Sequence, residues 1–99
     1  MVSNGINAQN ILQSYPNPTI ETLYIDVPNT DNKHFTAYEI AVYNVQGRLL
    51  ASQKVMANDA TKILLNVGHL TTGMYFYEVN GVEQEQTSML GKGKFKKIM

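Results

Sequence analysis

The chain of 99 residues contains no cysteine, so it can form neither a disulfide framework nor a thiolate metal site. It also has no apolar run approaching the roughly 18 residues that a membrane-spanning helix needs. The first residues, Met1–Asn7, lack the charged region and the apolar stretch of a signal peptide. We therefore expect no direct membrane insertion. If the chain is exported, we expect a preceding passenger protein to supply the signal.

Charge is scarce and unevenly distributed. Charged residues make up 16% of the chain and apolar residues 43%, which is typical of one globular domain. All eight acidic residues lie at or before Glu85, together with four basic ones. The last fourteen residues contain four lysines and no acid: Lys92, Lys94, Lys96 and Lys97. The sequence predicts an acidic body with a basic tail, with residues 1–12 as a linker or short first strand and residues 13–99 as the domain.

Alternation of apolar and polar residues predicts strands rather than helices. In Thr22–Val27, for example, Leu23, Ile25 and Val27 fall on one face. The other expected strands are Ile11–Leu12, Tyr38–Val45, Arg48–Val55, Lys62–Val67, Met74–Val79, Val82–Leu90 and Gly93–Ile98. About seven short strands separated by turn signals indicate an all-β, immunoglobulin-like antiparallel β-sandwich.

Turn residues predict how these strands connect. Asn44–Gly47 suits a hairpin loop with the glycine in the left-handed conformation. Asn80-Gly81 predicts a type I′ hairpin, because this dipeptide is the strongest short-range hairpin signal. Leu70 is expected in a tight turn that closes one end of the core. The prolines of Tyr15–Pro18 cannot donate to a ladder, so this segment is expected at a sheet edge or a crossing.

The sequence offers few catalytic candidates. His34 and His69 are the only histidines, and neither lies in a motif with a nucleophile. Asp26, Glu39 and Glu78 fall on different expected strands, where they either converge as paired carboxylates or simply face solvent. We favour exposed side chains in each case, and expect no catalytic residues, no cofactor and no enzyme activity.

Three ligand-binding patterns are also open to a simpler interpretation. Oxygen ligands for calcium occur at Asp26, Asn29, Asp31 and Asn32, but without EF-hand spacing, so we favour Asx turns. Gly91–Lys94 lacks the spacing of a phosphate loop. The tyrosines either form a carbohydrate-stacking strip or, as we favour, fill the core: Tyr15, Tyr24, Tyr38, Tyr43, Tyr75 and Tyr77. The lysine-rich tail either contacts phosphate or an anionic membrane, or protects an edge strand from aggregation.

Four motifs follow one another along the chain: Tyr15-Pro16-Asn17-Pro18 with Leu23–Ile25, Ile40–Leu50, Leu70–Tyr77 and Gly93–Lys97. In this order they resemble the type A C-terminal sorting domains of the type IX (Por) secretion system. The residues that carry the resemblance are Tyr15, Pro16, Asn17, Pro18, Tyr43, Asn44, Gly47, Leu70, Gly73 and Tyr75.

The resemblance implies an immunoglobulin-like sandwich of seven strands, and it also implies a function and partners. It implies a C-terminal signal, fused behind a passenger protein, that passes through the periplasm and directs the passenger to the cell surface or medium. The implied partners are the outer-membrane translocon, a shuttle receptor and a surface sortase that removes the domain near residues 1–12; no nucleic acid is expected. Recognition is expected on the final strand: Gly93, Lys94, Phe95, Lys96, Lys97 and Ile98. The alternative is an adhesion module that binds carbohydrate or protein.

Overall fold

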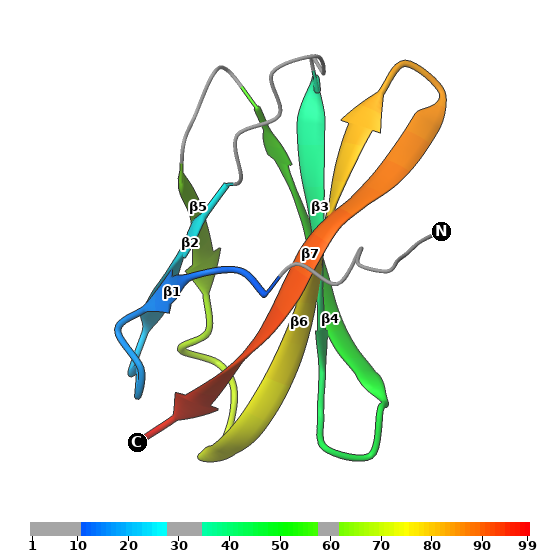
Figure 1. Ribbon diagram of the computed structural model, residues 1–99. Coiled ribbons are helices and arrows are strands. Elements are labelled where there is room, and N and C mark those ends of the chain that lie inside the picture. Colours follow the sequence, from blue (N-terminus) through cyan, green and yellow to red (C-terminus); the bar gives the residue numbers. More distant parts are fainter. Residues whose placement is uncertain (1–10, 28–34, 58–61) are drawn as a thin grey trace.

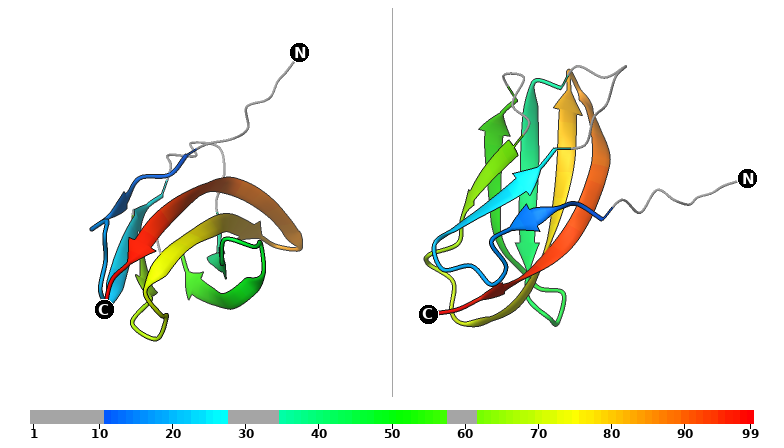
Figure 2. Two further views of the ribbon diagram at one scale, coloured as in Figure 1. Left: turned by 90° about the horizontal axis from the view of Figure 1, so that it is seen from below. Right: turned by 60° about the vertical axis from the view of Figure 1, so that its left-hand side comes forward.

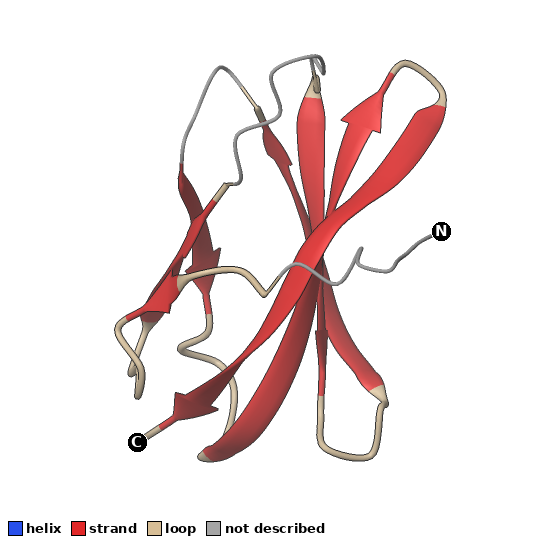
Figure 3. Cartoon of the chain, viewed as in Figure 1, coloured by secondary structure: helices blue, strands red, loops and turns tan. Residues whose placement is uncertain are grey.

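Seven antiparallel strands and no helix make up the part of the chain that the computed structural model describes, residues 11–27, 35–57 and 62–99 (Figures 1 and 3). The strands are β1 (Ser14–Tyr15), β2 (Thr22–Asp26), β3 (Ala37–Tyr43), β4 (Leu49–Met56), β5 (Lys62–Asn66), β6 (Gly73–Glu83) and β7 (Gln86–Lys97). Several residues considered above fall outside the described ones. They are the expected linker at residues 1–10, the histidine His34, and the possible calcium ligands Asn29, Asp31 and Asn32. No described helix is long and apolar enough to cross a membrane.

The strands form two facing sheets, of order β1-β2-β5 and β4-β3-β6-β7 (Figure 2). The pair β2–β5 faces the pair β3–β6, as in an immunoglobulin-like sandwich, so the predicted fold class is confirmed. The fourth strand, β4, pairs with β3 and forms one edge of the larger sheet. At the opposite edge of that sheet, β7 lies alongside the chain that leads into and out of β1.

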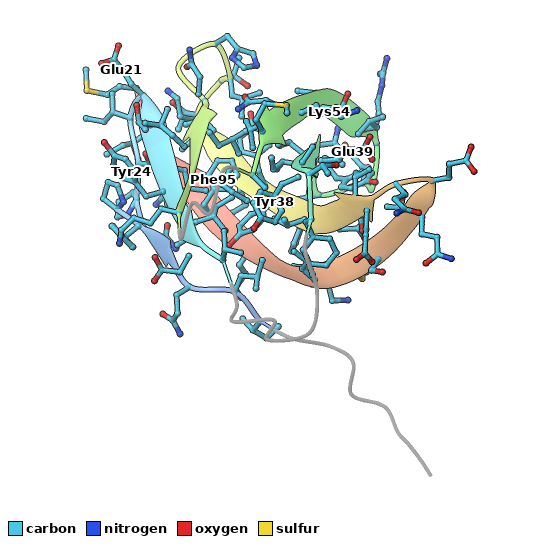
Figure 4. All side chains as sticks on the ribbon, turned by 90° about the horizontal axis from the view of Figure 1, so that it is seen from above. Glu21, Tyr24, Tyr38, Glu39, Lys54 and Phe95 are labelled. Carbon is cyan, nitrogen blue, oxygen red and sulfur yellow. The ribbon has the colours of Figure 1, made fainter. Side chains whose placement is uncertain are left out.

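The core lies between the sheets, where alternate residues of each strand meet. Leu23 and Ile25 of β2 are fully buried, as is Val42 of β3. Burying an apolar side chain of this size stabilises the fold by about 1.5–3 kcal/mol. The rings of Tyr75 and Phe95 stack with their centroids 5.5 Å apart. Figure 4 shows Phe95 between the sheets.

The predicted hairpin at Asn80-Gly81 is wrong, because these residues lie within β6 and continue its pairing with β3. Gly81 pairs with Tyr38 and lies against the ring of Phe35, where a Cβ would come within 2.6 Å of that ring. The glycine therefore makes room for an aromatic ring instead of turning the chain.

The β6–β7 turn lies four residues later, at Gln84 with φ 53°, between the paired residues Glu83 and Gln86. Consequently, the expected separate strands Val82–Leu90 and Gly93–Ile98 are wrong. Residues 82 and 83 belong to β6, and Gln86–Lys97 is one continuous strand.

The β3–β4 hairpin, by contrast, forms as the sequence predicts. Gly47 has φ 83°, in the left-handed region that glycine adopts without a steric penalty. The side-chain oxygen of Asn44 accepts hydrogen bonds from the backbone N–H groups of Gln46 and Arg48, both at 3.0 Å. Leu70 is partly buried against the end of the core, as expected for a residue that closes it.

Candidate functional site

The C-terminal half of β7, where recognition is expected, divides into two faces. Phe95 is fully buried and Lys97 is 1% exposed, so both belong to the interior side. Lys94 and Lys96 are exposed on the opposite side, as is Lys92. This alternation is the ordinary period of a strand, and it leaves only part of the predicted site accessible to a partner.

Two of the predicted recognition residues have structural roles. Gly93 pairs with Tyr77, and a Cβ there would lie 2.5 Å from the Tyr77 hydroxyl oxygen and 2.6 Å from Cζ. Tyr77 is fully buried, with its ring 6.3 Å from that of Phe95. Gly93 and Phe95 therefore pack the core.

Lys97 is unusual because its long, ionisable side chain is buried. Its Nζ donates a hydrogen bond to the backbone oxygen of Ile98 at 3.1 Å. Thr19, also 1% exposed, forms a parallel bridge with Lys97. The Lys97 side chain therefore lies inside the fold and is not available to a partner.

The outer backbone edge of β7 is already hydrogen-bonded in the folded domain. The Leu12 N–H donates to the Lys92 oxygen at 2.9 Å, and the Thr19 N–H donates to the Lys96 oxygen at 2.8 Å. The Ile98 N–H donates to the Thr19 oxygen at 2.9 Å. A second chain cannot add its backbone at these positions while residues 11–19 remain in place.

The Tyr15–Pro18 motif leads directly into Thr19, which makes two of these contacts. The Tyr15-Pro16 and Asn17-Pro18 peptide bonds are both cis. Beyond them, Thr19 Oγ1 donates to the Thr22 oxygen at 2.6 Å, and the Asn17 Oδ1 accepts from the Lys96 N–H at 2.9 Å. The motif lies along a sheet edge, as its prolines predict, and it anchors the last strand.

The other motif residues also support the fold. The Tyr75 hydroxyl donates to the Thr71 oxygen at 2.6 Å, which fastens the turn containing Leu70 to β6. Gly73 begins β6 opposite Lys97. Tyr43 lies on the outer face, where its hydroxyl donates to Glu78 Oε1 at 3.4 Å.

The three carboxylates that were considered for catalysis do not gather at one site, because Asp26 belongs to the smaller sheet while Glu39 and Glu78 are diagonal neighbours on two strands of the larger sheet. Asp26 lies on the outer face of the smaller sheet, 3.5 Å from Lys62 Nζ. Glu39 and Glu78 lie on the outer face of the larger sheet, in register with Asn80 and Ala41 respectively. His69 is an exposed turn residue. Among the described residues, no group of three or more histidines and acids comes together at metal-binding distance.

The tyrosines divide between the core and the surface, so the prediction that they fill the core is only partly right. Tyr38, Tyr75 and Tyr77 are buried. Tyr15 and Tyr24 are 39% and 37% exposed and stack with centroids 5.8 Å apart, because they pair directly across β1 and β2. Lys62 Nζ lies 5.2 Å from the Tyr15 ring centroid, and the contacts with Tyr15 and then Asp26 raise the Lys62 pKa.

An open depression of about 520 Å³ lies on the outer face of the larger sheet. It is lined by Tyr43, Asn44, Val45, Gly47, Phe76, Tyr77, Glu78, Lys92 and Gly93. Partial burial and then the neighbouring Glu78 carboxylate raise the pKa of Tyr43. The depression was not expected from the sequence, although the alternation in Gly73–Val79 already places Met74 and Phe76 on one face.

Comparison with known protein families finds a match over most of the chain. Residues 13–91 match the family of secretion system C-terminal sorting domains, a stretch that runs from before β1 into β7. No curated protein sequence matches the chain. The chain therefore belongs to the secretion system C-terminal sorting domain family, the C-terminal signals of type IX secretion.

Proposed function

We propose that this domain directs an N-terminally fused passenger through the outer-membrane translocon of the type IX system, and that it acts by docking rather than by catalysis. The family match over residues 13–91 carries this proposal. In this scheme the passenger first reaches the periplasm. The translocon and shuttle receptor then recognise the folded domain, and a surface sortase removes it upstream of the sandwich. The passenger ends at the cell surface or in the medium, and the domain needs no cofactor.

Recognition of the final strand is proposed to act through Lys94 and Lys96, with Ile98 contributing at the strand end. Their exposure supports this choice, since the two lysine side chains are exposed and Ile98 is partly exposed. Gly93, Phe95 and Lys97 contribute indirectly, by holding the strand in the fold.

Strand addition to β7 is a less direct mode of docking. A receptor strand that pairs with an open edge gains main-chain hydrogen bonds. Here the edge positions at Lys92 and Lys96 already accept from residues 12 and 19. Strand addition therefore requires displacement of residues 11–19, whereas side-chain docking does not.

The test is a fusion of residues 1–99 behind a signal peptide and a fluorescent protein. It is expressed in a bacterium that has the type IX system and in an isogenic strain without the translocon. We expect fluorescence at the surface or in the medium only in the first strain. Fluorescence that stays in the periplasm of both strains would contradict the proposal. Deletion of Gly93–Met99 is a poor substitute, because it also removes Phe95 from the core.

The stacked pair Tyr15 and Tyr24 supports a second candidate, a carbohydrate-binding module, because exposed aromatic rings stack on sugars. Lys62 already contacts Tyr15, which reduces the free ring surface. A glycan array probed with the isolated domain tests this candidate. Binding that disappears in Tyr24→Ala would support it, and a blank array would count against it.

A further inference from the structure

A row of lysines lies beside a row of exposed apolar side chains on the outer face of the larger sheet. Lys92, Lys94 and Lys96 are two residues apart on β7 and project from the same face. Strand β6 lies beside β7 (Figure 1). On β6, Phe76 pairs with Lys94 and Met74 pairs with Lys96. Phe76 is 43% exposed and Met74 is 41% exposed. We call these five residues the lysine face.

The depression of about 520 Å³ adjoins the lysine face, with Phe76 and Lys92 in its lining. Tyr43 adds a second aromatic ring to the same lining. The acid in the lining, Glu78, accepts the Tyr43 hydroxyl at 3.4 Å. The depression can therefore hold an apolar side chain of a partner between the rings of Phe76 and Tyr43, next to the cation of Lys92.

Neither core packing nor edge protection explains the lysine face. Met74 and Phe76 are large exposed apolar residues and lie outside the buried core cluster. Lysines protect an edge strand when its backbone is open to another chain. The β7 backbone at Lys92 and Lys96 is already covered by hydrogen bonds from residues 12 and 19. The exposed cations and rings therefore remain available to a partner.

We propose that the lysine face binds an extended acidic segment of a partner protein, with an apolar side chain of that segment in the depression. This inference rests on the proposed function and names the chemistry of the partner. Alternate side chains of an extended strand repeat every 6.5–7 Å or so, on both partners. Glutamates or aspartates at every second position therefore match Lys92, Lys94 and Lys96 in spacing and in charge.

A protein segment fits this surface better than an anionic membrane. Each lysine near an anionic lipid surface contributes only about 1 kcal/mol, so three lysines give weak binding. A lipid headgroup also makes no use of an aromatic-lined depression. The combination of regularly spaced cations with Phe76 and Tyr43 favours a partner that supplies both carboxylates and an apolar side chain.

The cellular test uses the same fluorescent fusion with two charge-matched variants. Lys94→Glu/Lys96→Glu reverses the lysine face, and Lys54→Glu/Lys62→Glu makes the same change in net charge on β4 and β5. We expect the first variant to lower export about tenfold, as lost ion pairs become repulsions, and the second to leave export close to wild type. Thermal denaturation of each purified domain verifies that it is folded.

The outcomes distinguish the two proposals. If the wild-type fusion is not exported, the sorting function fails. If it is exported and the lysine-face variant is exported equally well, the docking inference fails while the function stands. An equal loss in both charge variants also overturns the inference, because a general charge effect then explains the result.

A binding measurement separates a protein segment from a membrane. The purified domain is titrated with a synthetic peptide of alternating glutamate and leucine, and separately with phosphatidylglycerol vesicles. We expect the wild-type domain to bind the peptide and the binding to weaken as salt is added. Binding should be about tenfold weaker in Lys94→Glu/Lys96→Glu, and it should also be weaker in Phe76→Ser. Vesicle binding without peptide binding overturns the proposal in favour of a lipid surface. If Phe76→Ser binds the peptide as well as the wild type does, the proposed apolar contact in the depression is overturned.

Discussion

Asn17 and Lys96, 79 residues apart in sequence, are joined by a hydrogen bond of 2.9 Å from the Lys96 backbone N–H to the Asn17 Oδ1. This bond connects the two ends of the sorting domain. It gives the asparagine of the Tyr15–Pro18 motif a physical role, because the motif holds the last strand against the sandwich. The same strand carries the lysines that we propose to be recognised.

The first prediction concerns this contact. Asn17→Ala removes the acceptor, and we expect the free energy of unfolding to fall by about 1 kcal/mol. Amide hydrogen exchange at Lys96 should accelerate, while exchange in the middle of β3 should not. Asn17→Asp keeps an acceptor and serves as the control. Unchanged exchange at Lys96 in the alanine variant would show that the bond contributes nothing.

The second prediction concerns the contact between Gly93 and Tyr77. Gly93→Ala places a methyl group within 2.5 Å of the Tyr77 hydroxyl, so the buried ring must shift. We expect a loss of about 1–3 kcal/mol in a denaturant titration, as for other overpacked cores. Gly68→Ala is the matched control, because its nearest neighbour lies 3.4 Å away, an ordinary contact. Equal stability of the two variants would contradict this account of Gly93.

The third prediction concerns the Tyr77 hydroxyl, which is buried and makes no hydrogen bond of good geometry among the described residues, although its pKa, raised mainly by burial, is lowered in part by the nearby Ser14 side chain. A buried polar group without a partner destabilises the fold, so Tyr77→Phe should be neutral or stabilising by about 1 kcal/mol. A loss of more than about 1 kcal/mol would reveal a bond that holds this hydroxyl.

The fourth prediction concerns alkaline pH. Burial is the largest cause that raises the Tyr77 pKa above its ordinary value of 10.0. Because the folded state holds this proton more tightly than the unfolded chain, its contribution to stability is complete below pH 10 and is lost as pH rises through the folded pKa. Above pH 10, the free energy of unfolding of Tyr77→Phe should therefore fall less steeply with pH than that of the wild type. Denaturant titrations at a series of pH values from neutral to alkaline measure this difference. Tyr43→Phe, at a partly exposed site, should change the pH dependence of the free energy of unfolding less than Tyr77→Phe does.

The fifth prediction concerns the β6–β7 turn. Gln84 has φ 53°, a conformation that costs a residue with a side chain about 1–2 kcal/mol. Gln84→Gly should raise the midpoint of thermal unfolding, with a gain of about 0.5–1 kcal/mol after the entropy of glycine is counted. Glu85→Gly, at a position without positive φ, should not stabilise the domain. A lower midpoint for Gln84→Gly would contradict the turn geometry.

The sequence by itself was sufficient for the layered fold and for several of its details. Period-two alternation placed Leu23 and Ile25 on the buried face of β2, because successive side chains of a strand point to opposite sides. Gly47 in the β3–β4 hairpin was also predictable, since its left-handed backbone is a local property. The motifs in order were enough to predict the sorting-domain family.

Tertiary structure determined the conformation of those segments in which a local sequence signal competes with pairing between distant parts of the chain. Asn80-Gly81 is a turn signal by itself, but pairing with β3 and the ring of Phe35 keep it extended. Likewise, the sequence shows four lysines in the tail but does not reveal that Lys97 is buried. That depends on Thr19 and the loop that folds over β7, contacts between residues far apart in the chain. The alternation of apolar and polar residues is a property of a single strand. The register of that strand, and which of its side chains are buried, depend on the segments that pack against it.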